Sequence, residues 1–154
     1  MKTLVAVLLL SLSITSCRTD DLDDELPVID MSAVNAFPTA CVTVYRGESF
    51  EFKAVFTDNA ELGSYSIEMH HNFDRHTHST DGVPCDTDPV KTPVSPFQWI
   101  ENYTIPSGLQ RFEASNTIPI PSTVDTGLYH FMVRLTDAAG WQTFKGISVR
   151  IADR

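Results

Sequence analysis

The chain has 154 residues, with 11 Lys plus Arg against 20 Asp plus Glu, and a formal net charge of −9 at pH 7. This balance excludes nucleic acid as a partner, because phosphate contacts require a basic stripe or patch. The length suits one domain with a sizeable hydrophobic core.

The first 16 residues, MKTLVAVLLLSLSITS, have the pattern of a secretory signal peptide. Lys2 precedes an apolar run at residues 4–12, which is too short to span the ~30 Å hydrocarbon core of a bilayer. The ending ITSC at residues 14–17 resembles a bacterial lipobox, in which cleavage leaves a cysteine that receives acyl chains. We therefore predict lipidation of Cys17. The alternative is an ordinary cleaved signal in which this cysteine is incidental.

An acidic segment follows the cysteine. Five of the nine residues from 18 to 26 are acidic and none is aromatic, so the segment cannot bury enough surface to fold. Residues 17–26 are predicted to form a lipidated, acidic tether, and residues 27–154 the folded domain. Acidic residues soon after an acylated cysteine resemble the export signal of Bacteroidota lipoproteins. That resemblance implies an outer-membrane anchor with the domain on the cell surface; the alternative is a solvated linker in the periplasm.

The rest of the chain has the pattern of β-structure. Apolar and polar residues alternate with a period of two at 49–58, 64–70, 128–136 and 141–151, as half-buried strands require. Residues 27–34 and 41–45 are predicted to form a split first strand, and 97–105 and 111–120 two more. Because Phe144 is out of phase with Ile147, Gly146 is predicted to mark a bulge. The fold class is therefore all-β, an immunoglobulin-like sandwich of about seven strands.

Residues 125–129, DTGLY, match the D-x-G-x-Y pattern that enters the sixth strand of many such sandwiches. In that motif the glycine permits the sharp approach, and the tyrosine hydroxyl bonds back to the backbone of the corner. The motif thus predicts that Tyr129 fixes this corner; the alternative is a chance tyrosine at the start of an unrelated strand.

Two cysteines remain in the folded part, Cys41 and Cys85. In a small exported domain such a pair favours a disulfide, which would tie the loop that carries the histidines to an early strand. Two separate buried thiols are the alternative.

Four of the five histidines lie between residues 70 and 78, and the fifth is His130. In the predicted sandwich the third and sixth strands are neighbours, and parity places His70 and His130 on the same outer face. His76 and His78 are two residues apart, so in extended backbone they share a face at a separation of about 6.6 Å. If this loop folds back over the sheet, three or four imidazoles from three segments converge.

Neutral imidazole is the commonest ligand of transition metals, and the cluster predicts a transition-metal site, with zinc as the leading candidate. Asp74 or Asp137 would be a fifth ligand or would orient a ring. His71 has inward parity and is predicted to pack or to bond a carbonyl. One alternative is a hydrogen-bonded polar cluster without metal. Another is a calcium site built on three aspartates of the same loop: Asp81, Asp86 and Asp88.

Three segments, EMHHNFDRHTHST, PFQWIENYTIP and DTGLYHFMVRLTDAAGWQTFKGISVRI, resemble a family of Bacteroidota lipoproteins. These proteins carry a single immunoglobulin-like domain of unknown function. The resemblance covers residues 27–152 and the lipobox. It implies the sandwich fold and a location on the cell surface. Members of the family are rich in histidine around position 75, where this chain has Arg75 among its histidines.

The sequence favours a lipid-anchored extracytoplasmic binding module with a histidine-rich transition-metal site. The alternative is an accessory or adhesive module for glycan or protein, with contact aromatics drawn from Trp99, Trp141, Phe97 and Tyr103. A metal-dependent hydrolase would need an open coordination position and a base such as Glu68. Because the chain contains no H-E-x-x-H motif and no recognisable nucleophile, we expect a protein that is not an enzyme.

Overall fold

The computed structural model describes residues 22–78, 80 and 84–154. The predicted signal peptide, Cys17 and Asp81 lie outside the described residues. Within them the chain forms eight strands and no helix. No helix in these ranges is long and apolar enough to cross a membrane. The strands are β1 (Val28–Asp30), β2 (Thr43–Tyr45), β3 (Ser49–Thr57), β4 (Leu62–His71), β5 (Trp99–Thr104), β6 (Arg111–Pro119), β7 (Gly127–Asp137) and β8 (Gln142–Ala152).

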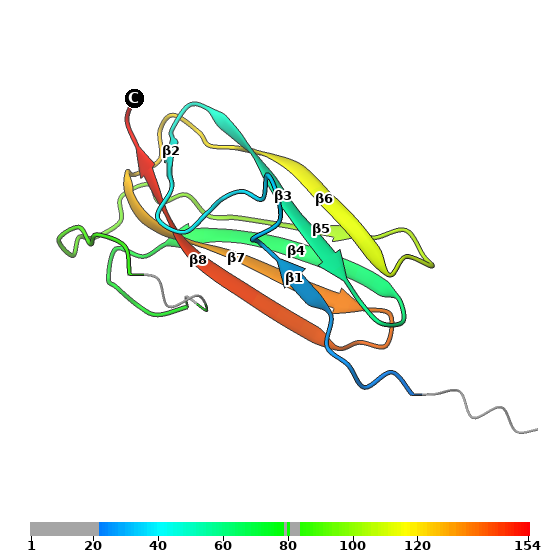
Figure 1. Ribbon diagram of the computed structural model, residues 1–154. Helices are drawn as coiled ribbons and strands as arrows, with labels where there is room; N and C mark the ends of the chain where they lie inside the picture. Colours follow the sequence, from blue (N-terminus) through cyan, green and yellow to red (C-terminus); the bar gives the residue numbers. More distant parts are fainter. Residues whose placement is uncertain (1–21, 79, 81–83) are drawn as a thin grey trace, which may run out of the picture.

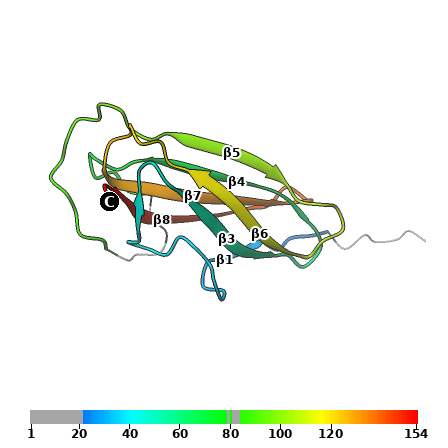
Figure 2. The same cartoon turned by 90° about the horizontal axis from the view of Figure 1, so that it is seen from above.

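The strands form two sheets that lie face to face, with the orders β1-β3-β6 and β2-β8-β7-β4-β5 (Figures 1 and 2). This arrangement confirms the predicted immunoglobulin-like sandwich. The split first strand is confirmed as well, since β1 pairs with β3 in one sheet and β2 runs parallel to β8 in the other. β1 is shorter than predicted because the Asp30 carboxylate accepts hydrogen bonds from the backbone and hydroxyl of Ser32, which turns the chain.

The core lies between the sheets and is built from the alternating inward residues of each strand. Phe52 and Phe56 on β3 and Phe131 on β7 are each 0% exposed, and the rings of Phe52 and Phe131 meet across the sheets at 5.6 Å. Burial of one such side chain contributes about 1.5–3 kcal/mol to folding. The two-residue period of the sequence therefore sets which residues face the core and which face outward.

The corner before β7 has the predicted tyrosine geometry. The Tyr129 hydroxyl donates to the Asp125 carbonyl at 2.6 Å and accepts the Phe97 N–H at 3.2 Å. Tyr129 is 0% exposed, and burial raises the pKa of its hydroxyl to about 12. The motif prediction is confirmed, and the same hydroxyl also fixes the end of the long β4–β5 loop.

The predicted bulge at Gly146 is wrong. β7 and β8 pair in unbroken register through the Met132–Gly146 pair. Phe144 simply faces outward, where the Arg134 guanidinium lies 4.9 Å from its ring centroid. Gly146 has a different role, because a segment of the β4–β5 loop lies directly against it.

Candidate metal centre

The floor of the candidate site is the pairing of β4 with β7. His70 and His130 are directly opposed in this antiparallel ladder, as strand parity predicts. They project from the outer face of the five-stranded sheet. His130 is nevertheless only 1% exposed, because the β4–β5 loop folds back over this face.

At Gly146 the loop lies directly against the sheet. The backbone N–H of Thr80 donates to the Gly146 carbonyl at 2.9 Å, and the Gly146 N–H donates to the Thr80 hydroxyl at 2.9 Å. A Cβ at residue 146 would collide with the backbone carbonyl of His78 and the side chain of Met132. Glycine is therefore required here by the close approach of two backbones.

A disulfide joins the loop to the segment before β2. Cys41 and Cys85 are bonded, with their Cα atoms 5.3 Å apart, and the bond spans 44 residues of sequence. This confirms the predicted pairing. The bond anchors the loop only a few residues beyond the histidines.

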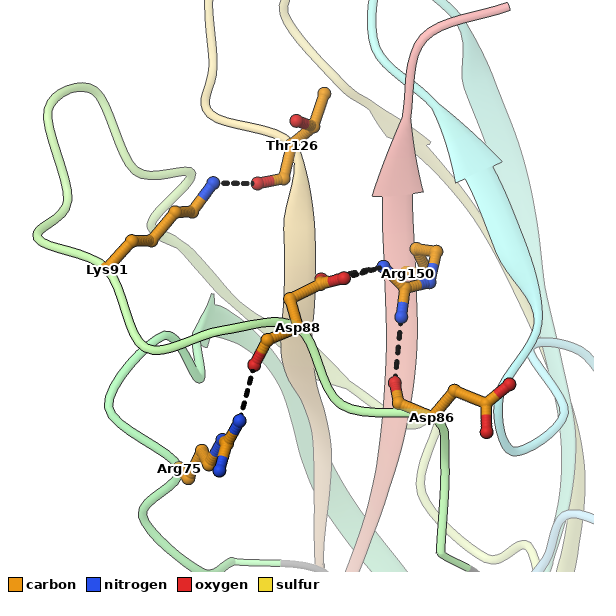
Figure 3. Close-up of polar contacts among 6 residues, drawn as sticks. All are labelled: Arg75, Asp86, Asp88, Lys91, Thr126 and Arg150. Carbon is orange, nitrogen blue, oxygen red and sulfur yellow. Dashed lines mark hydrogen bonds and ion pairs between the residues drawn. The ribbon is translucent and has the colours of Figure 1, made fainter.

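Charged side chains hold the next part of the loop (Figure 3). Arg150 on β8 donates to both carboxylate oxygens of Asp88, at 2.8 and 2.6 Å, and to the carbonyl of Asp86 at 2.8 Å. Arg75 donates to the Asp88 carbonyl at 2.8 Å. The Asp88 carboxylate is thus engaged by a guanidinium, which removes it from the alternative calcium site.

Lys91 makes the last of these attachments. Its ammonium group donates to the Thr126 carbonyl, as Figure 3 shows, and lies 4.2 Å from the ring centroid of Phe73. Together with the Tyr129 corner, these contacts hold the loop along its length by groups other than histidine. The loop therefore has a defined course that positions His76 and His78.

The four predicted imidazoles come together. All six distances between the ring centroids of His70, His76, His78 and His130 fall between 4.9 and 5.4 Å. For a zinc ion bound tetrahedrally with Zn–N distances of about 2.0–2.1 Å, four imidazole centroids lie about 5 Å apart. The observed spacing is that of four rings around one small ion.

The ring nitrogens converge less completely than the ring centres. One nitrogen each of His70, His76 and His78 lies within 4.8 Å of the others, and His130 does not belong to this group. His130 Nε2 lies 3.0 Å from the His76 carbonyl, and its Nδ1 is buried with no hydrogen-bond partner among the described residues. Nitrogens of three rings thus lie close together, and the fourth ring is adjacent with one buried nitrogen unsatisfied.

Neighbouring acceptors orient the rings. His76 Nδ1 lies 2.5 Å from Asp74 Oδ1, and this hydrogen bond lowers the pKa of the exposed Asp74 carboxyl. His70 Nδ1 lies 2.9 Å from Glu68 Oε1, close enough for an ion pair, but the orientation does not satisfy hydrogen-bond geometry. An acceptor on one ring nitrogen directs the other nitrogen toward a shared ion, the usual arrangement of histidine ligands. Asp74 thus lies where an orienting residue is predicted.

Burial favours the neutral form of two of the rings. Desolvation is the main cause that lowers the pKa of His70, against the opposing attraction of Glu68. Desolvation also lowers the pKa of His130, against its bond to the His76 carbonyl. Neutral imidazole is the form that binds metal.

Two other predicted residues lie outside the cluster. Asp137 is seven residues from His130 at the far end of β7, about 24 Å away at 3.4 Å per residue, and so is not a ligand here. It instead accepts the backbone N–H groups of Gly140 and Trp141. His71 packs on Phe73 with ring centroids 4.9 Å apart, as its inward parity predicts.

A pocket of about 330 Å³ lies beside the cluster, between the loop and the sheet. Its lining includes His76 and His130 together with Phe73, Lys91 and Leu128. No sequence pattern indicates this pocket, because it depends on the course of the loop.

The aromatic residues considered as glycan contacts do not form one exposed patch. Phe97 is 5% exposed, and Trp99 and Tyr103 pack against the core. Tyr103 also stacks on Tyr65 with ring centroids 4.8 Å apart. Trp141, at 45% exposed, lies at the β7–β8 turn, away from β5.

Comparison with known proteins identifies the family. A search of curated proteins finds no relative of this chain. Among solved structures, the GspB Siglec domain is similar at 24% identity and a TM-score of 0.45, over 86% of this chain and 60% of that one. The chain thus spans less than two thirds of that structure, and a likeness of this degree says nothing about what either chain binds. A family profile matches residues 15–152, and the chain belongs to that family, which is described as a domain of unknown function, DUF4625.

Proposed function

We propose that this domain binds one transition-metal ion, zinc by preference, through His70, His76 and His78, with His130 Nδ1 as the fourth ligand. The observation that carries the proposal is the mutual approach of four imidazole rings at the spacing of a tetrahedral site. The His130 ring already lies in the cluster, and its Nε2 is held by a backbone carbonyl, which leaves Nδ1 to bind the ion.

A polar cluster without metal explains the arrangement less well. Four imidazoles in mutual contact lose water, and His130 Nδ1 gains no hydrogen bond in return among the described residues. An unsatisfied buried polar group costs about 1–3 kcal/mol, which a metal–nitrogen bond would offset. The proposal therefore supplies a partner for the buried Nδ1 of His130.

The donor set limits the choice of ion. Imidazole nitrogens suit zinc, copper, nickel and iron, whereas calcium and magnesium take oxygen ligands. Four histidines would fill a tetrahedral shell and leave no position for a reactive water. We therefore propose a structural or metal-capturing role and not hydrolysis, although Glu68 lies beside His70.

The test uses protein purified without an affinity tag and stripped with chelator. Titration with zinc should show one equivalent bound, and zinc at 100 times its dissociation constant should stabilise the fold by about 2.7 kcal/mol. The double variant His76→Ala/His78→Ala should lose both effects. The matched control is His71→Gln, which removes a neighbouring histidine outside the cluster and should bind as the parent does. Equal melting temperatures of the parent in zinc and in chelator would refute the proposal.

A further variant tests the fourth ligand. His130→Gln should weaken zinc binding at least tenfold, because it removes one of four nitrogens. Unchanged affinity in this variant, together with loss in His78→Ala, would show instead a three-histidine site with a water.

We also propose that the domain is a lipoprotein of the bacterial outer membrane, attached through Cys17 and exposed at the cell surface. The supporting observation is the lipobox-like sequence at residues 14–17, followed by the acidic segment. Expression in a lipoprotein-processing bacterium should give a membrane-bound form with an acylated Cys17 by mass spectrometry. The Cys17→Ser variant should be released into the soluble fraction.

A further inference from the structure

A second cluster of possible ligands lies at the other end of the sandwich. Carboxylate oxygens of Asp23, Asp58 and Asp137 all lie within 4.8 Å of one another. Asp58 directly follows β3, Asp137 is the last residue of β7, and Asp23 belongs to the segment before β1. Figure 1 shows that this segment leaves the sandwich at the end that carries the β3–β4 and β7–β8 turns.

Two of these carboxylates are buried because each closes a turn. Asp58 Oδ1 accepts the backbone N–H groups of Ala60 and Glu61 at 2.9 and 2.8 Å. Asp137 Oδ1 accepts those of Gly140 and Trp141 at 2.6 and 2.8 Å. The turns thus use one oxygen of each side chain and leave the second available for another partner.

Within the described part of the chain, the second oxygens of Asp58 and Asp137 have no hydrogen-bond partner. Asp58 is 9% and Asp137 3% exposed, and Oδ2 of each is buried without a hydrogen bond among the described residues. Among residues 22–78, 80 and 84–154, no lysine or arginine forms an ion pair with Asp23, Asp58 or Asp137. Buried carboxylates are normally paired or bound to a metal, so this arrangement calls for a cation.

We infer that Asp23, Asp58 and Asp137 bind a calcium ion. Calcium takes oxygen ligands at 2.3–2.6 Å, so two oxygens bound to one ion lie no more than about 5.2 Å apart, and the three carboxylate oxygens, all within 4.8 Å of one another, meet this condition. An all-carboxylate set in irregular turns suits calcium, which tolerates variable geometry, better than magnesium. Waters and backbone carbonyls would complete the shell. This site shares no residue with the histidine cluster.

The third ligand gives the site a specific role. Trp141 Nε1 donates to the Asp23 carbonyl at 2.8 Å, so the segment before β1 already lies against the β7–β8 turn. A calcium ion between Asp23 and the two turns would fasten this segment to the domain. The site would therefore set the stiffness and direction of the connection to whatever precedes the sandwich.

The test titrates the chelator-stripped full chain with calcium chloride and follows heat and melting temperature. Extracellular calcium modules bind with dissociation constants of about 10⁻⁴–10⁻³ M, so titration to about 10 mM covers the range. We expect one equivalent of calcium and a higher melting temperature. Asp58→Asn retains the oxygen that closes its turn but lacks the charge. It should weaken calcium binding at least tenfold without loss of fold in calcium-free buffer.

Two controls separate this inference from others. The His76→Ala/His78→Ala variant should bind calcium like the parent, and this result is expected even if the parent does not bind zinc. In a Trp99→Phe background, the fluorescence of Trp141 should respond to calcium, and Asp23→Asn should remove that response. Absence of calcium heat and of a melting shift would overturn the inference, as would equal affinity for magnesium or undiminished binding by Asp58→Asn.

Discussion

His70 on β4 and His130 on β7 are directly opposed across an antiparallel pair, with ring centroids 5.4 Å apart. The sheet therefore fixes two of the four clustered histidines. The other two, His76 and His78, depend on the course of a loop. Changes to the loop attachments should consequently alter metal binding even when no histidine is touched.

The disulfide is the first such attachment. Replacing Cys41 and Cys85 together by alanine opens a loop of 44 residues. In the chain-entropy account this lowers the free energy of unfolding by about 4 kcal/mol. Zinc affinity should fall as well, because His76 and His78 lose their nearest covalent anchor. Urea denaturation and zinc titration measure the two effects. A variant with lower stability but undiminished affinity would show that the other loop contacts suffice.

Gly146 provides a second and more local test. In Gly146→Ala the new Cβ collides with the His78 carbonyl, so the loop must move away from β8. We expect zinc affinity to fall at least tenfold, although residue 146 bears no ligand. Phe144→Ala is the matched control, since Phe144 faces the same side of β8 and contacts Arg134. If both variants bind zinc as the parent does, the loop does not position His78 through Gly146.

The metal-free protein should lose stability in mild acid. Burial lowers the pKa of His70 and His130 below the value of 6.5 expected in an unfolded chain. Between the two values the unfolded chain binds more protons, so the free energy of unfolding falls as the pH drops from about 6.5 through the lowered pKa values. Urea denaturation in chelator at about pH 8 and about pH 5 measures this. The double variant His70→Gln/His130→Gln should show a weaker dependence, and a parent that gains stability on acidification would contradict the prediction.

Strand periodicity predicted the fold because each strand has one buried face. The alternation at 64–70 and 128–136 places His70 and His130 correctly, and the D-x-G-x-Y motif identifies the Tyr129 corner. These features depend on local patterns of residues, which can be read from a single sequence. The bulge prediction at Gly146 failed because local phase cannot reveal that a distant loop lies against the strand.

The loop contacts and the carboxylate cluster could not be predicted. The pairing of Arg150 with Asp88, and the meeting of Asp58 with Asp137, join residues 62 and 79 positions apart with no periodic signal. Asp137 is one of two aspartates predicted beside the histidines, but the length of β7 separates it from His130. Charged residues in loops are common, and only the folded arrangement shows which of them meet.

The two ends of the sandwich differ in what they carry. The chain enters at β1, beside the β3–β4 and β7–β8 turns, whereas the loop that carries His76 and His78 begins at the opposite end, where β4 ends (Figure 1). Under the proposed attachment through the N-terminal segment, this loop would begin at the end of the sandwich farther from the membrane. Solutes would then reach the loop by diffusion without passing the membrane surface.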